Sequence, residues 1–400
     1  MIIESVTFKR SKREKLLKLL LAGRSFILFG PRQTGKSTLL EDIFAELPKE
    51  RTLRYYFQLP SERERIESDP EIILREVEAK GNKEPAYLFI DEIQKIPRVM
   101  DVLQFLIDKG KVVLGATGSS ARKMKNFGTN WLPGRVHIEH LYPLTWDESA
   151  LLKFPVNITA NLLYGALPGI LAEKDLITRE ESLFDYTSLY LDEEIRMEAL
   201  TRNIPRFSKF LRLAALESGS APNFSKIGGV VGLTHPTIRE YFQILEDTLI
   251  IHRLDAYGSS RDAVLRSARY YFFDIGVRNA AAGIGCGKGI LPLQIGLLFE
   301  HFVVLEIMAR LKHQPGTELF YWRTKQGEEV DLIIKKGSRL IALEIKATAK
   351  PSTQDLSGLE TFCRKHSGAE AYLICQTPRP QKLRHILAIP WFELPEKLGL

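Results

Sequence analysis

The chain has 400 residues, of which 44% are hydrophobic and 26% are charged. This balance excludes an intrinsically disordered chain, and the length exceeds the ~250–300 residues at which one hydrophobic core stops growing, so two or three domains are expected. The formal net charge of +7 favours an anionic partner such as nucleic acid only weakly, because the excess is spread along the chain.

The cysteine content and the hydropathy pattern indicate the compartment. Cys286, Cys363 and Cys375 have no metal-ligand or redox spacing, so they are interpreted as buried small side chains in a reducing compartment. The N-terminus lacks the apolar core of a signal peptide, and no stretch is expected to span a bilayer. A cytoplasmic protein without a membrane partner is therefore expected.

A basic run at residues 9–15 leads into a short helix at 16–21. A solvated helix face is favoured for this run over an arm that contacts nucleic acid. The next segment, to about Leu144, alternates apolar β-runs with helical stretches, as a parallel sheet covered by helices requires. Residues 1–145 are therefore predicted to form an α/β nucleotide-binding core with five parallel strands, at 25–30, 54–59, 86–91, 112–118 and 137–141.

A phosphate-binding loop follows the first expected strand. Glycines let such a backbone curl so that its N–H groups, and the N-terminus of the helix that follows, face the phosphates. Lys36 is expected to reach the terminal phosphates and Ser37 to bind Mg²⁺. The predicted ATP site comprises Gly30, Pro31, Arg32, Gln33, Thr34, Gly35, Lys36, Ser37 and Thr38.

Two carboxylates end the third expected strand, 86–91, at the sheet edge where open α/β sheets bind ligands. Asp91 is expected to hold the magnesium, directly or through water. Glu92 is expected to act as the general base that polarises the water attacking the γ-phosphate. An exposed loop charge is the usual interpretation of an Asp-Glu pair, but the strand before it and the phosphate loop upstream favour the catalytic one.

Four further side chains are candidates for the same site. Ser119, or Thr117 beside it, is placed to position the lytic water or to sense the γ-phosphate, although small residues after a strand also serve as turn residues. Arg135 precedes the fifth strand as an arginine finger would, and a surface arginine is the alternative. Arg122 is a weaker candidate for that task.

At these residues the chain resembles the prokaryotic AAA-type ATPases whose P-loop domain is followed by a domain of uncharacterised function, DUF4143. The N-terminal part of the resemblance rests on the segments 30–37, 88–95, 117–122 and 132–135. The C-terminal part rests on 270–276, Phe299-Glu300, 321–323 and 329–346. The resemblance implies an ATP-binding core, a winged helix and a nuclease-like C-terminal fold, with DUF4143 at about 202–346.

The middle of the chain is mainly helical. Residues 146–201 are expected to form a helical lid or connector, and three helical patterns followed by two strand-like runs predict a winged helix-turn-helix at 202–282. If this module contacts double-stranded DNA, base contacts would come from Thr237, Arg239 or Gln243 and phosphate contacts from Arg261, Arg266 and Arg269. Winged helices also serve as protein-contact surfaces, so that alternative stays open.

Residues 283–400 are expected to form a small α/β domain that resembles restriction endonucleases. The resemblance rests on Asp331 and on the Glu344-x-Lys346 pattern, with Glu300 in the preceding helix as the additional acid. Strand periodicity places Glu344 and Lys346 on one face, so with Asp331 they could hold a second divalent metal and orient a water. An ion-paired strand surface is the alternative, and the fold alone specifies no cleavage.

The sequence as a whole favours a magnesium-dependent ATPase that acts as a switch or remodeller and controls the winged-helix and nuclease-like module, with DNA as the expected substrate of that module. Two alternatives remain: an ATP-gated regulator that binds a protein partner with an inactive nuclease-like domain, and an ATP-regulated, metal-dependent DNase. A homo-oligomer is required only if Arg135 acts in trans.

Overall fold

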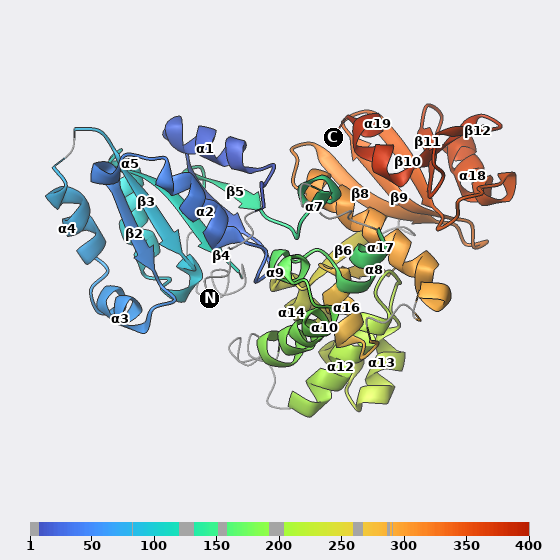
Figure 1. The fold of residues 1–400 in the computed structure, drawn as a ribbon, viewed down its shortest axis with the longest axis horizontal. Coiled ribbons are helices and arrows are strands. Elements are labelled where there is room, and N and C mark those ends of the chain that lie inside the picture. Colours follow the sequence, from blue (N-terminus) through green and yellow to red (C-terminus); the bar gives the residue numbers. More distant parts are fainter. Residues whose placement is uncertain are drawn as a thin grey trace. The chain divides into compact units, whose positions relative to one another are not determined.

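The computed structural model describes residues 8–81, 83–119, 132–150, 158–191, 204–258, 267–285, 289 and 291–399. The chain divides into two compact units, one of residues 1–144 with 247–250 and the other of residues 145–246 with 251–400 (Figure 1). Each unit is described by itself below.

The first unit is an α/β domain with a five-stranded parallel sheet in the order β2-β3-β4-β1-β5, which confirms the predicted fold class. The strands are β1 Ser25–Phe29, β2 Thr52–Tyr56, β3 Ala86–Asp91, β4 Val112–Gly118 and β5 Val136–His140. The helices are α1 Arg13–Leu21, α2 Lys36–Ala45, α3 Pro60–Ser68, α4 Ile72–Ala79 and α5 Val99–Asp108, with short 3₁₀ turns at Lys49–Arg51 and Ile93–Lys95.

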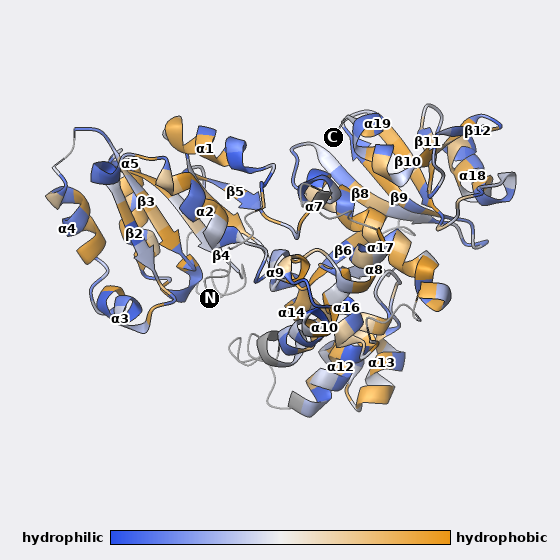
Figure 2. Cartoon of the chain, viewed as in Figure 1, coloured by the Kyte–Doolittle hydropathy of each residue, from blue (hydrophilic) through white to orange (hydrophobic). Residues whose placement is uncertain are grey.

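Both faces of this sheet are covered, so its central strands are apolar along their whole length. Every residue of β1, β3 and β4 is buried, and Figure 2 shows these strands as largely hydrophobic. Successive side chains alternate between the faces. On one face Phe26 and Phe89 pack with α1 and α2. On the other face Ile27 and Leu88 pack with α3, α4 and α5.

The basic run at the N-terminus is held within the first unit. Lys12 and Lys15 pair with Glu139 of β5, the Lys12 Nζ to Glu139 Oε2 distance being 3.1 Å. Arg13 pairs with Asp42 of α2 and with Glu46, the residue that follows this helix. Lys15 is exposed and Lys12 and Arg13 are partly exposed, and these ion pairs neutralise part of the positive charge of the run with carboxylates of the same unit.

The second unit begins with helices. They are α7 Trp146–Ala150, α8 Ile158–Tyr164, α9 Pro168–Ala172, α10 Leu176–Asp185 with a π-helical extension Tyr186–Leu191, α12 Ile204–Leu216, α13 Phe224–Val231 and α14 His235–Asp247. α16 Ile275–Ala281 and α17 Leu291–Leu311 follow later in the chain. The helical region expected after the ATPase core is therefore present, and the three helices of the expected helix-turn-helix correspond to α12, α13 and α14.

A mixed eight-stranded sheet, in the order β12-β13-β11-β10-β9-β8-β6-β7, forms the rest of this unit. Its strands are β6 Ile251–Ala256, β7 Arg269–Phe272, β8 Thr317–Arg323, β9 Glu329–Lys336, β10 Arg339–Ile345, β11 Glu370–Cys375, β12 Gln381–Leu383 and β13 Ile386–Pro390. Short helices accompany it: Thr353–Leu356, α18 Ser357–Lys365, Trp391–Glu393 and α19 Leu394–Leu398.

The two strands expected as a separate wing belong to this sheet. β6 pairs antiparallel with β7 and parallel with β8, where Asp255 lies opposite Phe320. The ranges 202–282 and 283–400, expected to be separate domains, therefore share one sheet. Backbone pairing between residues far apart in sequence decides this, and no local pattern reports it.

Helix α17 corrects the expectation that no stretch could span a bilayer. It has 21 residues, and an 18-residue window of it has a mean hydropathy of 1.6, so the helix is long and apolar enough to cross a membrane by length and composition. Nine of its residues are buried in the second unit, among them Phe299, Val303 and Ile307. We therefore interpret α17 as a core helix of the second unit, because a core helix can be as long and as apolar as a membrane span. Of the cysteines, Cys375 is buried as expected, Cys363 is partly exposed, and Cys286 lies outside the described residues.

Candidate functional site

The phosphate loop connects β1 to α2, in the order that the sequence predicted. Gly35 has φ +86° and Gln33 has φ +61°, so the loop reverses direction through left-handed backbone. A Cβ on Gly30 would lie 2.3 Å from the carbonyl oxygen of Leu141, after β5. Only glycine fits at residue 30, and the loop is consequently packed tightly against its neighbouring strand.

The side chains of Lys36 and Thr34 bind carbonyl oxygens inside the loop. Lys36 is 5% exposed, and its Nζ donates to the carbonyl oxygens of Gly30 and Pro31 at 2.8 Å each. Thr34 donates from Oγ1 to the Pro31 carbonyl at 2.9 Å. The ammonium is thus held over the loop, while Arg32 is partly exposed and Gln33 and Thr38 are exposed.

The two oxygen atoms expected to bind magnesium lie together. Ser37 Oγ donates to Asp91 Oδ1 at 2.7 Å, although the residues are 54 apart in sequence. Asp91 also accepts from Thr117 Oγ1 at 2.5 Å and from Gln58 Nε2 at 2.6 Å. A hydroxyl and a carboxylate at this separation suit Mg²⁺, which prefers oxygen ligands beside bound phosphates. The donor set therefore fits the ATP-magnesium complex that the phosphate loop implies.

Glu92 follows β3 in left-handed backbone, with φ +59° and ψ +51°. Such a conformation is uncommon for a non-glycine residue and is maintained here by neighbouring contacts. The Glu92 N–H donates to Thr117 Oγ1 at 2.9 Å. Its carboxylate oxygen Oε2 accepts from Ser119 Oγ at 2.9 Å and from Gln94. Ser119 and Thr117 therefore hold the two carboxylate residues rather than standing apart from them.

Sequence reasoning missed Gln58 and Gln94. Gln58 lies two residues beyond β2, the neighbour of β3, and Gln94 lies two residues beyond Glu92. Their position after adjacent parallel strands was the available signal, because those ends meet at one sheet edge. Lys95, next to Gln94, is also close to this site, and its burial lowers its pKa.

Arg135 does not lie at the phosphate edge of the sheet. It immediately precedes β5, whose first residue, Val136, pairs with Ser25 at the start of β1. Its guanidinium binds Asp108 at the end of α5, with Nε to Oδ1 at 2.6 Å and Nη2 to Oδ2 at 3.0 Å. The structure thus removes Arg135 from a role in cis, because the phosphate loop follows the opposite end of β1. Arg122 lies outside the described residues.

The C-terminal acidic residues do converge, but around an arginine. Arg269 Nη1 lies 3.2 Å from Glu300 Oε1 and 3.8 Å from Asp331 Oδ1, and Nη2 contacts Glu329. The guanidinium also stacks on Tyr321, 4.8 Å from its ring centroid. Arg269 was a candidate phosphate contact in the sequence, and the structure instead makes it the counter-ion of this cluster.

Glu344 and Lys346 form the other side of the same cluster. Lys346 Nζ donates to Glu344 Oε1 at 2.6 Å, whereas Glu344 Oε2 is buried with no hydrogen-bond partner among the described residues. Asp331 Oδ2 accepts the Ile345 N–H at 2.8 Å. Burial raises the pKa of Glu344 and of Glu300, and the nearby charge of Asp331 raises both further. The positive charges of Arg269 and Lys346 therefore offset the negative charge of these carboxylates only in part.

Metal binding at this cluster finds no support in its geometry. Across the described ranges, no group of three or more histidine, cysteine, aspartate or glutamate side chains is arranged to hold a metal ion. A guanidinium among the carboxylates explains this, since it already supplies positive charge at their centre. The residues as placed do not fit the second metal that the sequence suggested.

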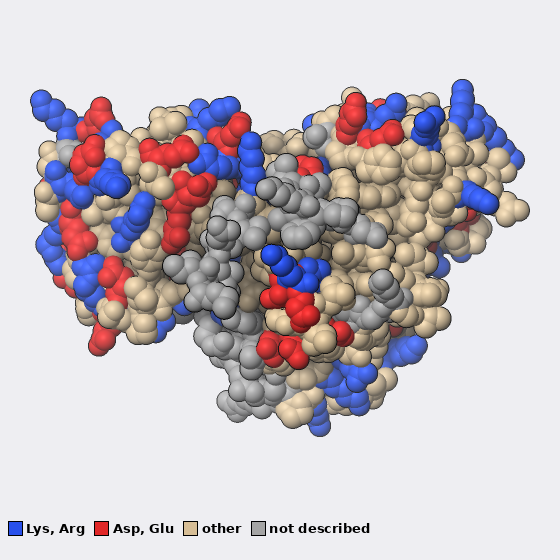
Figure 3. Space-filling model, in the orientation of Figure 1, with Lys and Arg blue, Asp and Glu red and all other residues tan. Residues whose placement is uncertain are grey.

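The expected recognition helix is α14. Ile238, Phe242 and Leu245 are buried as predicted, and Arg239 and Gln243 are exposed. Arg261 and Arg266 lie outside the described residues. On the face of the molecule drawn in Figure 3, Lys and Arg are interspersed with Asp and Glu in the first unit. The net positive charge thus forms no single-sign surface there.

Three sequence families match consecutive parts of the chain. Residues 22–150 match the AAA domain, residues 157–286 match a domain of unknown function, DUF8612, and residues 295–394 match another, DUF4143. The DUF4143 match begins and ends later than the expected range of 202–346. The expected order, an AAA-type domain followed by DUF4143, is confirmed.

Two curated relatives match most of the chain. An uncharacterized protein of Mycobacterium tuberculosis is 24% identical over 352 residues, which is 86% of this chain and 75% of that one. An uncharacterized protein of Methanocaldococcus jannaschii is 23% identical over 376 residues, covering 84% and 78%. Among solved structures, a Walker-type ATPase of Pyrococcus abyssi is similar with a TM-score of 0.49 and 17% identity, covering 69% of this chain and 96% of that one.

Proposed function

Because the chain joins an AAA-type P-loop ATPase domain to a C-terminal DUF4143 domain, we propose that it is a magnesium-dependent ATPase whose nucleotide state controls its second unit. The observation that carries this proposal is the continuous set of hydrogen bonds from Ser37 through Asp91 and Thr117 to Glu92. It joins the phosphate loop to the proposed general base.

Each residue of the site has a distinct task. The loop N–H groups and Lys36 bind the β- and γ-phosphates, and Ser37 with Asp91 supplies oxygen ligands for magnesium. When bound, magnesium neutralises part of the phosphate charge. Glu92 accepts the proton of the attacking water on its carboxylate. Ser119 and Gln94 donate hydrogen bonds to that carboxylate and hold it beside Asp91, the proposed magnesium ligand.

Nucleotide binding tests the first half of this proposal by a readout other than turnover. Titration calorimetry with ATP is performed with and without Mg²⁺ on the wild type, Lys36→Ala and Ser37→Ala. We expect Lys36→Ala to lose binding and Ser37→Ala to lose most of the Mg²⁺-dependent gain. Lys18→Ala on the outer side of α1 is the matched control. Magnesium-independent binding in the wild type, or binding unaffected by Lys36→Ala, would contradict the assignment.

DNA is the partner we propose for the second unit, through the exposed side chains of α14. The supporting observation is that Arg239 and Gln243 are exposed on a helix whose other face is buried. We expect duplex DNA binding that weakens with salt and that falls several-fold in Arg239→Ala, but not in Lys382→Ala, a control on exposed β12. Binding that is absent or independent of salt would favour a protein partner instead.

The burial of nine α17 residues within the second unit supports our placing of the protein in the cytoplasm.

A second candidate is the regulator whose nuclease-like domain does not cleave, and Arg269 is the observation that favours it. Its guanidinium occupies the centre where cleavage would need a metal. We expect plasmid DNA to remain intact with Mg²⁺ or Mn²⁺, with or without ATP. Cleavage by the wild type and by Glu318→Gln, an exposed control, that Asp331→Asn abolishes would refute this candidate and restore the DNase.

A further inference from the structure

Arg10 connects two backbone segments of the first unit. The residue lies just before α1 and is 7% exposed. Its Nη1 donates to the carbonyl oxygen of Thr34 at 3.0 Å, and its Nη2 donates to the carbonyl oxygen of Tyr142 at 2.6 Å. A single guanidinium thus joins the phosphate loop to the segment that follows β5. The forked donors of arginine make both bonds at once, which a lysine ammonium cannot do in the same geometry.

The first of these bonds orients a phosphate-binding N–H group. In a trans peptide the C=O and the N–H point in opposite directions. Because the Thr34 carbonyl points toward Arg10, the N–H of Gly35 in the same peptide plane points away from Arg10. Gly35 begins the helix N-terminus that faces the phosphates, and its φ of +86° belongs to the same turn. Arg10 therefore binds the side of this peptide that is opposite to the Gly35 N–H.

The second bond lies at the exit of the ATPase core. Leu141 N–H donates to Phe29 of β1 at 2.7 Å, and the Leu141 carbonyl packs on Gly30. Tyr142, the next residue, is the one that Arg10 holds. The same stretch of backbone is therefore bound to the phosphate loop from two sides, by packing at Leu141 and by the guanidinium at Tyr142.

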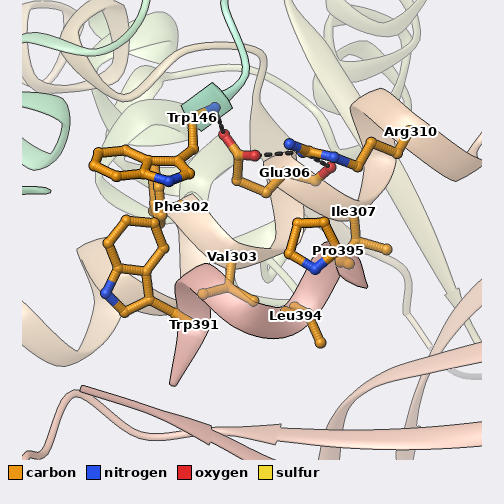
Figure 4. Close-up of a pocket in the computed structure, with 9 residues that line it drawn as sticks. All are labelled: Trp146, Phe302, Val303, Glu306, Ile307, Arg310, Trp391, Leu394 and Pro395. Atoms are coloured by element: carbon orange, nitrogen blue, oxygen red, sulfur yellow. Dashed lines mark hydrogen bonds and ion pairs between the residues drawn. The ribbon is translucent and has the colours of Figure 1, made fainter. Parts of the chain in front are cut away.

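Only residues 143–145 separate Tyr142 from an anchor in the second unit. Trp146 donates its backbone N–H to Glu306 Oε1 at 2.9 Å, and Arg310 binds Glu306 (Figure 4). The indole of Trp146 packs edge-on against that of Trp391, with ring centroids 4.7 Å apart. Each unit thus holds its own end of this short connection, so a shift at one end is not absorbed by a long flexible linker.

We propose that Arg10 is a positioning residue for ATP binding and couples the phosphate loop to residues 141–146, the connection to the second unit. This inference rests on the proposed ATPase function and specifies its regulation. When nucleotide binds, the Thr34–Gly35 peptide adjusts to the phosphates, and Arg10 transmits that adjustment to the carbonyl of Tyr142.

The test measures affinity and backbone exchange on the full chain. The magnesium complex of adenylyl imidodiphosphate, which is not hydrolysed, is titrated into the wild type, Arg10→Met and Arg10→Lys. Hydrogen exchange of the peptide 141–150 is then followed with and without the nucleotide. Arg13→Met is the matched control, because Arg13 lies in the same basic run but pairs with Asp42 and Glu46.

We expect the nucleotide to slow exchange at 141–150 in the wild type and in Arg13→Met. In Arg10→Met the affinity should fall on the order of tenfold, as for loss of one charged hydrogen bond, and the exchange response should disappear. KM for ATP should rise while kcat changes less than about threefold, because a positioning residue acts on binding rather than on the proton transfer. Arg10→Lys should restore part of the affinity but not the exchange response.

The outcomes distinguish failure of the coupling role of Arg10 from failure of the proposed ATPase function. A wild type that does not bind the nucleotide refutes the proposed ATPase function itself. If the wild type binds but Arg10→Met has unchanged affinity and exchange response, the coupling role is overturned and the ATPase function stands. If Arg10→Met fails to fold, Arg10→Lys decides, because it retains the buried charge: a response equal to that of the wild type overturns the proposal, and a lost response supports it.

Discussion

Substitution of Glu92 by glutamine is the sharpest probe of hydrolysis. The amide has nearly the size of the carboxylate, and its oxygen can still accept hydrogen bonds from Ser119 and Gln94, which now bind Glu92 Oε2. The backbone bond from the Glu92 N–H to Thr117 is unaffected. The substitution therefore removes the ability to take up a proton and leaves the surrounding geometry in place.

The magnitude follows from these contacts. Removal of a positioned general base lowers the rate of the chemical step by about 10²- to 10⁴-fold, which corresponds to about 2.7–5.5 kcal/mol of transition-state stabilisation. Affinity for ATP should stay within about threefold, because the hydrogen bonds of Glu92 go to Ser119, Gln94 and Thr117 rather than to Lys36 or Ser37.

Phosphate release is measured at saturating ATP and magnesium, together with the dissociation constant of ATP, for the wild type and Glu92→Gln. Glu78→Gln, on the exposed side of α4, controls for the loss of one negative charge. Ser119→Ala should lower kcat by less than Glu92→Gln, since it releases the carboxylate without removing it. A Glu92→Gln rate within threefold of the wild type, or a parallel tenfold loss of affinity, would refute the general-base assignment.

Four further predictions address the rest of the chain. In Thr117→Val the partly buried N–H of Glu92 loses the hydroxyl that accepts its hydrogen bond, so urea denaturation should show a loss of about 1–3 kcal/mol in unfolding free energy; an unchanged midpoint would contradict the described contact. Arg135→Ala should leave the ATPase rate of a dilute monomer unchanged, and a loss that appears only at concentrations where sedimentation shows oligomers would instead support a contact in trans. In Gly165→Ala the new Cβ would lie 2.0 Å from the Asp274 carboxylate in left-handed backbone, so thermal unfolding should reveal destabilisation on the order of 3 kcal/mol. Burial raises the pKa of Glu344 to about 8, so its stabilising contribution is complete below the unfolded pKa of about 4.5 and is lost as pH rises through about 8; the wild type should lose stability relative to Glu344→Gln between pH 5 and 9, and the opposite trend would exclude the raised pKa.

The phosphate loop and the two carboxylates beside it could be located from the sequence because each of these signals is local. Residues 30–38 contain the turn glycines, the lysine and the hydroxyl within one continuous loop, and the strand before them supplies the geometry. Asp91 and Glu92 carry a second local signal, an apolar strand that ends in two carboxylates. The rule that parallel strands present their ends at one edge then joins the two segments without further information.

Other predictions depended on which segments pack together, and the structure decided them. Arg135 looks like a finger because it precedes a strand, but the parallel register of β5 with β1 places it at the opposite edge from the phosphates. The acids of the C-terminal part were expected to share a metal. Instead, pairing of β6 with both β7 and β8 makes the β6–β7 hairpin part of the C-terminal sheet, and Arg269 of β7 lies among the carboxylates.

The sequence by itself therefore determined the position of the phosphate loop and the order of helices and strands, because propensity and hydrophobic period act over a few residues. Tertiary structure alone decided the counter-ion of the C-terminal acids and the bridge that Arg10 makes between Thr34 and Tyr142. Those contacts join residues more than twenty positions apart, and they form only when folding of the unit brings these residues together. No local pattern in the chain can report them.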